Sequence, residues 1–416
     1  MRRLVATSAL ATVAVAAGLG SFVAVRVAAF DPPVVVDITV PPQMSVAPGT
    51  PPVIPLPAGG GIAVATDVDG TVAAFHGDDV APIGSVAKTM TALVVLSAKP
   101  LPPGHDGPSL TMTREDVALY RQAVAENGSA IAVRDGEVLS EREMLLALML
   151  PSANNIAETL AGWVAGDRAS FIAQLNGEAM SLGMGHTHFD DPSGFSAATT
   201  STPADLLLLA KRAIADPTLA AIVGTQSSTL SDGTQLRNLD VLLDSPGWLG
   251  IKTGWTPRAG GCLLFSARRS FAAAAAPVTV FGAVLGQPPS SPDDPQHPEL
   301  GGAFRVARQA AGAALDAYTA VDASSLRPAV SGRLTTAWDD STALRLGWVV
   351  SAVQVTVRLG TSAQLAALGS RPRPSISAGQ QTGVVIATLH GRALATWTVV
   401  TDAAVGVPSW WWKLWH

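Results

Sequence analysis

Ser85 and Lys88 lie three residues apart in the otherwise apolar segment IGSVAKTMTALVVL of this 416-residue chain. On a helix, residues at this spacing share one face. A serine becomes a good nucleophile when a base removes its proton, and a buried lysine of lowered pKa is such a base, whereas arginine stays protonated. The pair therefore predicts nucleophilic catalysis. The same three-residue spacing also fits a non-catalytic lysine on an amphipathic helix that extends its charged end to solvent.

Two further segments carry polar residues suited to the same chemistry. LMLPSANNIAETLAG places Ser152 and Asn154 in a break between two expected helices, where a hydroxyl can relay a proton and an amide can hold a lysine or a substrate carbonyl. GIKTGWTPRAGG places Lys252, Thr253 and Gly254 at the end of an expected strand. Lysine and threonine form a receptor for a carboxylate, and glycine lets a substrate backbone approach the strand edge. Each segment alone is equally typical of a helix cap or a strand end.

The composition disfavours several classes of protein. A net charge of −5 provides no basic stripe, so we expect no nucleic-acid partner. The single cysteine, Cys262, excludes an intramolecular disulfide and a multi-cysteine zinc site, and we expect it to be a buried apolar residue. The seven histidines show no HExxH spacing, so we expect no metal and no cofactor.

The sequence pattern also predicts the helices and strands that position these residues. IAVATDVDGTVAAF predicts two strands joined by an Asp-Gly turn. SEREMLLALML predicts a helix that begins with a capping box of Ser140 and Glu143. From about residue 324, short β-type runs separated by Gly and Pro predict a separate small β domain over residues 324–404. Other helices are expected just beyond Asn154 and over residues 203–214 and 302–318, and other strands over residues 249–253, 262–265 and 278–285.

The two ends of the chain predict export and attachment to a membrane. Within residues 1–29, the uncharged run Leu4–Val25 follows two arginines and has about the length of a membrane span, while the small residues 27–29 suit a cleavage site. A cleaved signal peptide and a retained anchor both fit, and either places the rest outside the cytoplasmic membrane. Residues 30–60, rich in Pro and Val, predict an extended linker. The tail, residues 405–416, ends in WWWKLWH, which suits a membrane interface and equally an apolar tail packed on the β domain.

Taken together, the three motifs resemble those of one enzyme family. SxxK, SxN and KTG occur in that order, about 67 and 100 residues apart. With their flanking text and the segment MGHTHFDDPSGF, they resemble the serine D-alanyl-D-alanine carboxypeptidases, the low-molecular-mass penicillin-binding proteins. The resemblance implies an α+β catalytic domain over residues 61–320, with a β-lactamase/transpeptidase-like antiparallel sheet flanked by helices and a helical subdomain. Many members carry a small all-β domain after it.

The resemblance also implies a role for each motif residue. Ser85 is then the acylated nucleophile and Lys88 its general base. Ser152 relays the proton to the leaving D-alanine, and Asn154 orients Lys88 and the substrate amide. The implied substrate is the peptidoglycan stem peptide, and the implied inhibitors are β-lactams, which stop at the acyl-enzyme.

The third motif supplies the remaining implied contacts. Lys252 maintains the electrostatics of the proton relay, and Thr253 binds the substrate carboxylate beside Gly254. The backbone N–H groups of Ser85 and Trp255 form the oxyanion hole.

The chain departs from some relatives at two places. These have a histidine before the glycine of the turn that here reads Asp191-Pro192-Ser193-Gly194. Some also have an arginine for the terminal carboxylate after a strand-end glycine, where this chain has Gly286-Gln287. Arg258 and Arg268 are the candidates to replace that arginine.

Two other functions fit parts of the pattern. A β-lactamase shares the first and third motifs, but class A members need a Glu-x-x-Leu-Asn sequence about 35 residues past the second motif, where this chain reads GMGHTHFDDP. A non-catalytic cell-wall binding or scaffold protein on the same fold has no reason to retain Ser85 and Lys88. We therefore expect a hydrolase.

Overall fold

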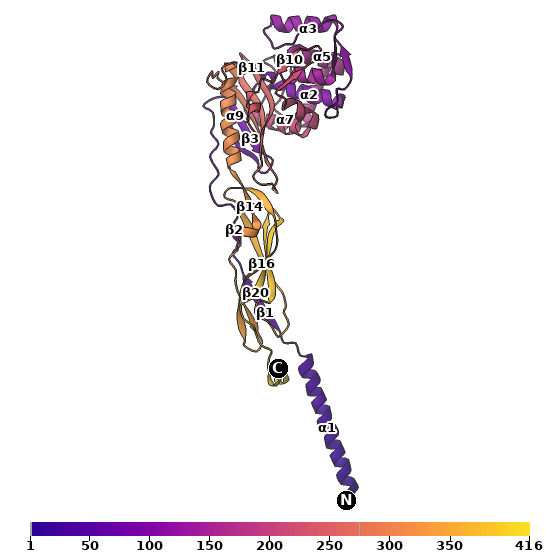
Figure 1. Cartoon of the computed structure of the whole chain (residues 1–416), viewed down its shortest axis with the longest axis vertical. Helices are drawn as coiled ribbons and strands as arrows, with labels where there is room; N and C mark the ends of the chain where they lie inside the picture. The colour runs from indigo at the N-terminus through magenta and orange to yellow at the C-terminus, as the bar shows by residue number, and fades with distance from the viewer. Residues whose placement is uncertain (1, 274) are drawn as a thin grey trace. The chain divides into compact units, whose positions relative to one another are not determined.

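The computed structural model describes residues 2–273 and 275–416 and divides into two compact units (Figure 1). One unit is Pro51–Tyr318, which contains all three motifs. The other combines the described residues up to Thr50 with Thr319–His416.

The motif-bearing unit is built on a five-stranded antiparallel sheet in the order β11-β12-β13-β3-β4. The predicted Asp-Gly hairpin and the three later strand runs all lie in this sheet. Because β11 is an edge strand, one side of it is not paired within the sheet. The strands are β3 (Gly61–Thr66), β4 (Gly70–Phe75), β11 (Trp248–Thr256), β12 (Gly260–Arg269) and β13 (Val278–Gln287).

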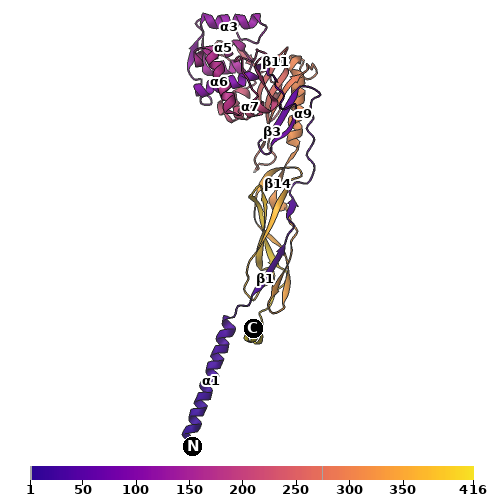
Figure 2. The same cartoon turned by 180° about the vertical axis from the view of Figure 1, so that it is seen from behind.

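Helices cover both faces of this sheet, as the predicted fold class requires. Helix α9 (Pro298–Asp316) packs on β12 and β13, and α7 (Pro203–Ala215) packs on β13 and β3 from the other side (Figures 1 and 2). Successive strand side chains point to opposite faces, so Leu263 joins the core under α9 and Cys262 joins the core of the helical side. Cys262 is fully buried as expected, and burial raises the pKa of its thiol to about 12.

A helical region fills the other side of the sheet around α2. Its α4 begins with the predicted capping box, in which Ser140 Oγ accepts from Glu143 N and Glu143 Oε2 accepts from Ser140 N. The helices are α2 (Lys88–Ala98), α3 (Arg114–Ala125), α4 (Glu141–Met149), α5 (Asn154–Ala165), α6 (Arg168–Ser181) and α8 (Pro217–Val223), with the 3₁₀ turns η1 (Gly84–Ala87) and η2 (Val241–Asp244). Short paired strands connect them, namely β5 (Ala81–Pro82) with β8 (Thr200–Ser201), β6 (Ser109–Thr111) with β7 (Val138–Ser140), and β9 (Ser227–Thr229) with β10 (Gln235–Arg237).

The second unit contains a seven-stranded sheet in the order β1-β15-β16-β20-β19-β18-β2. Its buried Trp397 lies in a core separate from those of the motif-bearing unit. A further pair, β14 with β17, completes the unit, and Tyr318, expected in the last helix, instead begins β14. The strands are β1 (Val34–Thr39), β2 (Gln43–Ser45), β14 (Tyr318–Asp322), β15 (Ser331–Thr336), β16 (Ser341–Ala352), β17 (Gln354–Arg358), β18 (Ser362–Gly369), β19 (Gln381–Leu389) and β20 (Arg392–Thr401), with the 3₁₀ turn η3 (Ala323–Ser325).

The linker predicted over residues 30–60 is wrong for its first half. β1 pairs along its whole length with β15, and β2 pairs with β18. The reason is the alternation of Val34, Val36 and Ile38, which pack against the core of this sheet, while the prolines lie outside the strands.

The second unit also holds both terminal helices, α1 (Arg2–Ala29) and α10 (Trp410–Trp415). They are in contact, and the rings of Phe30 and Trp412 lie 5.9 Å apart between centroids. Among residues 2–273 and 275–416, no helix is both long enough and apolar enough to span a membrane.

Candidate active site

Ser85 lies in the turn η1, which leads directly into α2. The chain reaches this turn through Gly84, whose φ of 53° is in the left-handed region that favours glycine. A Cβ at Gly84 would lie 3.1 Å from the backbone N of Trp255, so this glycine also permits the close approach of β11. The sequence places Ser85 three residues before Lys88, and the turn directs both side chains to one point.

Lys88 is completely buried and makes three polar contacts. Its Nζ lies 2.8 Å from Ser85 Oγ, 2.7 Å from Asn154 Oδ1 and 2.8 Å from the backbone O of Ser193. Burial lowers the pKa of Lys88 well below its ordinary value, and the positive charge of Lys252 lowers it further. A neutral amine has two hydrogens and one lone pair, so it can donate to the two carbonyl oxygens and accept the Ser85 proton.

The second motif contacts Lys88 through Asn154. Asn154 is the first residue of α5, which fixes its amide against the lysine. Ser152 is buried, with a φ of 66°, an uncommon backbone conformation for a residue other than glycine. Its Oγ has no hydrogen-bond partner among the described residues. A buried hydroxyl of this kind is open to a proton or a substrate group.

The third motif lies on the edge strand β11. Lys252 and Thr253 are both buried, with Lys252 Nζ 3.5 Å from Thr253 Oγ1. Burial lowers the pKa of Lys252 to about 7, and the negative charge of Asp240 opposes this shift. Burial raises the pKa of Asp240 to about 6, and this carboxylate accepts from Trp248 Nε1 at 3.1 Å. A pKa near 7 makes the charge of Lys252 sensitive to pH around neutrality.

Gly254 lies directly against the turn that holds Ser85. A Cβ there would lie 2.9 Å from Ile83 O and 3.0 Å from Ser85 N. The missing side chain thus lets β11 pack directly on the Ser85 turn. Trp255, the next residue, is 43% exposed, and its backbone N faces Gly84.

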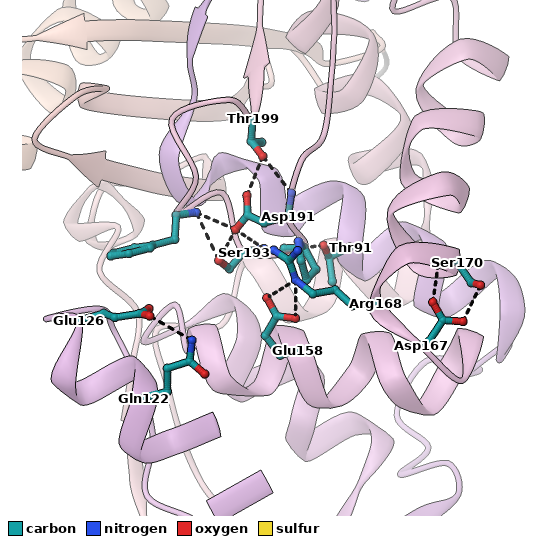
Figure 3. A network of polar contacts seen from close by, with 12 residues as sticks. Thr91, Gln122, Glu126, Glu158, Asp167, Arg168, Ser170, Asp191, Ser193 and Thr199 are labelled. Carbon is teal, nitrogen blue, oxygen red and sulfur yellow. Dashed lines mark hydrogen bonds and ion pairs between the residues drawn. The ribbon is translucent and has the colours of Figure 1, made fainter. Parts of the chain in front are cut away.

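Asp191 and Ser193 belong to the site, although the sequence marked their turn only as a departure from relatives. Ser193 supplies the carbonyl oxygen that accepts from Lys88 Nζ. Buried Asp191 holds this turn by accepting from Ser193 Oγ at 2.6 Å, Thr199 Oγ1 at 2.6 Å and Phe195 N at 2.9 Å (Figure 3). The pattern Asp-Pro-Ser-Gly is a recognisable turn signature, but no sequence signal connects its carbonyl to Lys88.

Comparison with known proteins places the chain in a family. The family model described as D-alanyl-D-alanine carboxypeptidase matches residues 51–283, more than half of the chain. The chain belongs to this family. The D-alanyl-D-alanine endopeptidase of Escherichia coli is 33% identical over 196 residues, which are 45% of this chain and 60% of the relative. The D-alanyl-D-alanine carboxypeptidase of Streptomyces sp. is 34% identical over 219 residues, 49% of this chain and 71% of the relative.

Solved structures support the fold of this carboxypeptidase-family chain. The crystal structure of the Streptomyces K15 DD-transpeptidase matches with 29% identity and a TM-score of 0.53, over 62% of this chain and 98% of that enzyme. A penicillin-binding protein homologue from Mycobacterium tuberculosis matches with 26% identity and a TM-score of 0.54, over 65% of this chain and 95% of its own. The predicted fold class is confirmed. The chain spans only 60% and 50% of the first curated relatives, from Escherichia coli and Bacillus subtilis.

The candidates for the missing arginine of this family differ in position. The amide of Gln287 already has partners, because its Nε2 donates to Gly59 O at 2.9 Å and to Leu285 O at 3.0 Å. Thr253 pairs with Leu263 of β12. Arg268 lies five residues further along β12, where it pairs with Thr279 of β13. Arg258 is exposed in the turn that follows Trp255. Position along the strands favours Arg258 over Arg268.

The site brings together two serine hydroxyls, an asparagine amide and two buried lysines. Across residues 2–273 and 275–416, no group of three or more His, Cys, Asp or Glu side chains is arranged to hold a metal ion. The chemistry that this site can support is acyl transfer by a serine.

Proposed function

We propose that the chain is a serine hydrolase that removes the terminal D-alanine from peptidoglycan stem peptides through an acyl-enzyme on Ser85. The observation that carries this proposal is the position of Lys88 Nζ, fully buried, 2.8 Å from Ser85 Oγ and held by two carbonyl oxygens. This geometry and the lowered pKa of Lys88 both favour the neutral amine that a general base requires.

Acylation begins with transfer of the Ser85 proton to the lone pair of Lys88 Nζ. The Ser85 oxygen then bonds to the carbonyl carbon of the penultimate D-alanine. The backbone N–H groups of Ser85 and Trp255 stabilise the oxyanion, with each donor contributing about 3–4 kcal/mol. The close packing of Gly254 against Ser85 N supports this arrangement.

Breakdown of the tetrahedral intermediate requires a proton on the leaving amine. The hydroxyl of Ser152 passes this proton from Lys88, and its unpartnered Oγ supports that role. The carbon–nitrogen bond then breaks and D-alanine leaves. A water molecule hydrolyses the acyl-enzyme, adding its hydroxide to the carbonyl carbon and returning a proton to Ser85. A penicillin forms the same bond but is released slowly.

The substrate enters as an added strand along the unpaired edge of β11. Thr253 and protonated Lys252 bind its terminal carboxylate, and Asn154 holds the amide of the acyl group. Because such substrates belong to the cell wall, the catalytic unit works on the outer side of the cytoplasmic membrane.

The experiment that tests this function is labelling of the purified chain with a fluorescent penicillin, alongside release of D-alanine from an acetylated peptide ending in D-Ala-D-Ala. We expect covalent labelling and D-alanine release. A folded chain that does neither contradicts the proposal and favours a non-catalytic protein on the same fold, whereas rapid turnover of the penicillin favours a β-lactamase.

We also propose that the second unit attaches to the membrane surface through α10, next to the end of α1. Trp410, Trp411 and Trp415 are more than half exposed, which suits rings that enter a lipid interface. The full chain should co-sediment with phospholipid vesicles, and replacing these three tryptophans with serine should reduce binding. Trp348→Ser, an equally exposed tryptophan on β16, is the matched control. Equal binding by both variants contradicts this proposal.

A further inference from the structure

A groove of about 600 Å³ lies between helix α3 and the segment 133–135. Helix α3 is at the edge of the helical region, away from the five-stranded sheet (Figures 1 and 2). We name this feature the Arg121 groove. The polar side chains that line it are Arg114, Tyr120, Arg121, Arg134 and Asp135.

The Arg121 groove is separate from the active site. Arg114 and Arg121 are seven residues apart on α3 and therefore lie on one face of this helix. The side chains that α3 directs toward Asn154 are those of residues such as Leu119 and Gln122, which lie on the opposite face. A ligand in the groove thus leaves the approach to Ser85 free.

The groove carries excess positive charge, although the chain as a whole has a net charge of −5. Arg121 is exposed and forms no ion pair with the part of the chain that the structure describes. Arg114 Nε donates to Asp135 at 3.1 Å, but both side chains are more than half exposed, so this pair contributes little to stability and can open. Arg134 Nη1 lies 3.9 Å from Asp232, too far for a hydrogen bond. All three arginines therefore have N–H groups to offer to a ligand.

The stability of α3 does not explain its first arginine. Arg114 is the first residue of this helix, where the positive end of the helix dipole disfavours a cation. The helix start is already satisfied by a capping box, in which Thr113 Oγ1 accepts from Asp116 N and Asp116 accepts from Thr113 N. An arginine at this position is better explained by a bound anion.

The spacing and chemistry of the lining indicate what kind of anion fits. Arg114 and Arg121 are about 10 Å apart along α3, from the rise of seven residues, so one small anion does not reach both. The Tyr120 hydroxyl is also free to donate, since it has no hydrogen-bond partner among residues 2–273 and 275–416. The one carboxylate, Asp135, is already engaged by Arg114. Such a lining suits a chain of acceptors, whereas a peptide would bring N–H groups that need acceptors of their own.

We propose that the Arg121 groove binds a linear polymer whose units are joined by phosphodiesters. The guanidinium groups of Arg114, Arg121 and Arg134 contact successive phosphates, which match the planar donor fork of arginine. The polymer tethers the catalytic unit and takes no part in the reaction at Ser85.

The test uses a fluorescently labelled abasic oligodeoxynucleotide, which is a phosphodiester chain without bases. Fluorescence anisotropy follows its binding to the full chain at a series of salt concentrations. The affinity should fall with salt, and Arg121→Gln and Arg134→Gln should each weaken binding at low salt about tenfold, as for loss of a hydrogen bond to a charged group. Each variant should also lower the slope of log affinity against log salt by about 0.7, the value for one phosphate contact on a single strand. Thermal melting confirms that the variants are folded.

Arg308→Gln is the matched control, because Arg308 is an exposed arginine of α9, which packs on the other face of the sheet. It should bind the oligomer as the wild type does. Absence of binding by the wild type, or an equal loss in Arg308→Gln and Arg121→Gln, overturns the proposal.

Two competitors separate the proposed ligand from other anions. Tighter binding of poly-L-glutamate with the same number of charges overturns the proposal in favour of an acidic peptide. Complete displacement of the oligomer by orthophosphate at the same phosphate concentration overturns it in favour of a site for a single anion. None of these measurements needs catalytic activity, so their outcome is independent of the proposed function.

Discussion

Replacing Lys88 with arginine keeps a positive charge at this position but removes the base. An ordinary lysine, with a pKa of 10.5, is neutral in only about one molecule in 3,000 at pH 7. Complete burial of Lys88 reduces this penalty because it disfavours the charged form. Arginine is never neutral in a protein, so burial cannot turn it into a base. We expect Lys88→Arg to lower the acylation rate by about 10²–10⁴-fold or more, the range for loss of a general base.

The assay is the second-order rate constant for acylation by a fluorescent penicillin, measured between pH 5 and 9. The wild-type rate should rise with pH until Lys88 is neutral and then level off, because only the neutral amine takes the Ser85 proton. Lys99→Arg provides the same substitution at the exposed end of the same helix, α2, and should behave as the wild type. Thermal melting confirms that each variant is folded. A Lys88→Arg enzyme that acylates within tenfold of the wild-type rate refutes the role given to Lys88.

Three further predictions concern other parts of the molecule. The KM for a peptide with a free terminal carboxylate should rise as the pH increases above about 7, because Lys252, with a pKa of about 7, loses its charge; a KM that is constant from pH 6 to 9 contradicts this. Gly254→Ala should slow penicillin acylation about tenfold or more by displacing the Ser85 turn, whereas Gly312→Ala, with open space around it, should not. Val36→Lys should lower the stability of the β-rich unit by about 1–3 kcal/mol in a denaturant titration and leave acylation unchanged; an unaltered unfolding curve contradicts the pairing of β1.

The sequence predicted those features of the site that depend on local spacing. Ser85 and Lys88 are three residues apart, and one turn of backbone is sufficient to bring their side chains together. The capping box at the start of α4 and the Asp-Gly hairpin are equally local, since a few neighbouring residues determine each. Family resemblance then connected motifs that are far apart in the chain.

Contacts that depend on tertiary packing were not predictable in the same way. The carbonyl oxygen of Ser193 contacts Lys88 across 105 positions, and a backbone oxygen carries no signature of residue type. Nothing in the sequence indicates that Gly254 also lets β11 pack on the Ser85 turn. The protonation of Lys252 depends on its burial beside Asp240, which only the folded chain determines.

The misinterpretation of β1 has a different physical cause. The prolines on either side of β1 are typical of a linker, and they outweighed the alternation of Val34, Val36 and Ile38. A single strand with one half-buried face is stable only when a partner strand is available, and the partner here, β15, begins almost 300 residues later. The composition of residues 30–60 could not predict β1, because its partner strand β15 is so distant in the chain.

The most direct test of the central claim is to identify the residue that a penicillin acylates. The purified chain is incubated with the penicillin, digested and analysed by mass spectrometry, with Ser85→Ala and Ser152→Ala treated in parallel. We predict one adduct, on the peptide that contains Ser85, which is absent from Ser85→Ala and forms more slowly in Ser152→Ala. An adduct on Ser152 with Ser85 unmodified, or an undiminished adduct in Ser85→Ala, contradicts the assignment of Ser85 as the nucleophile.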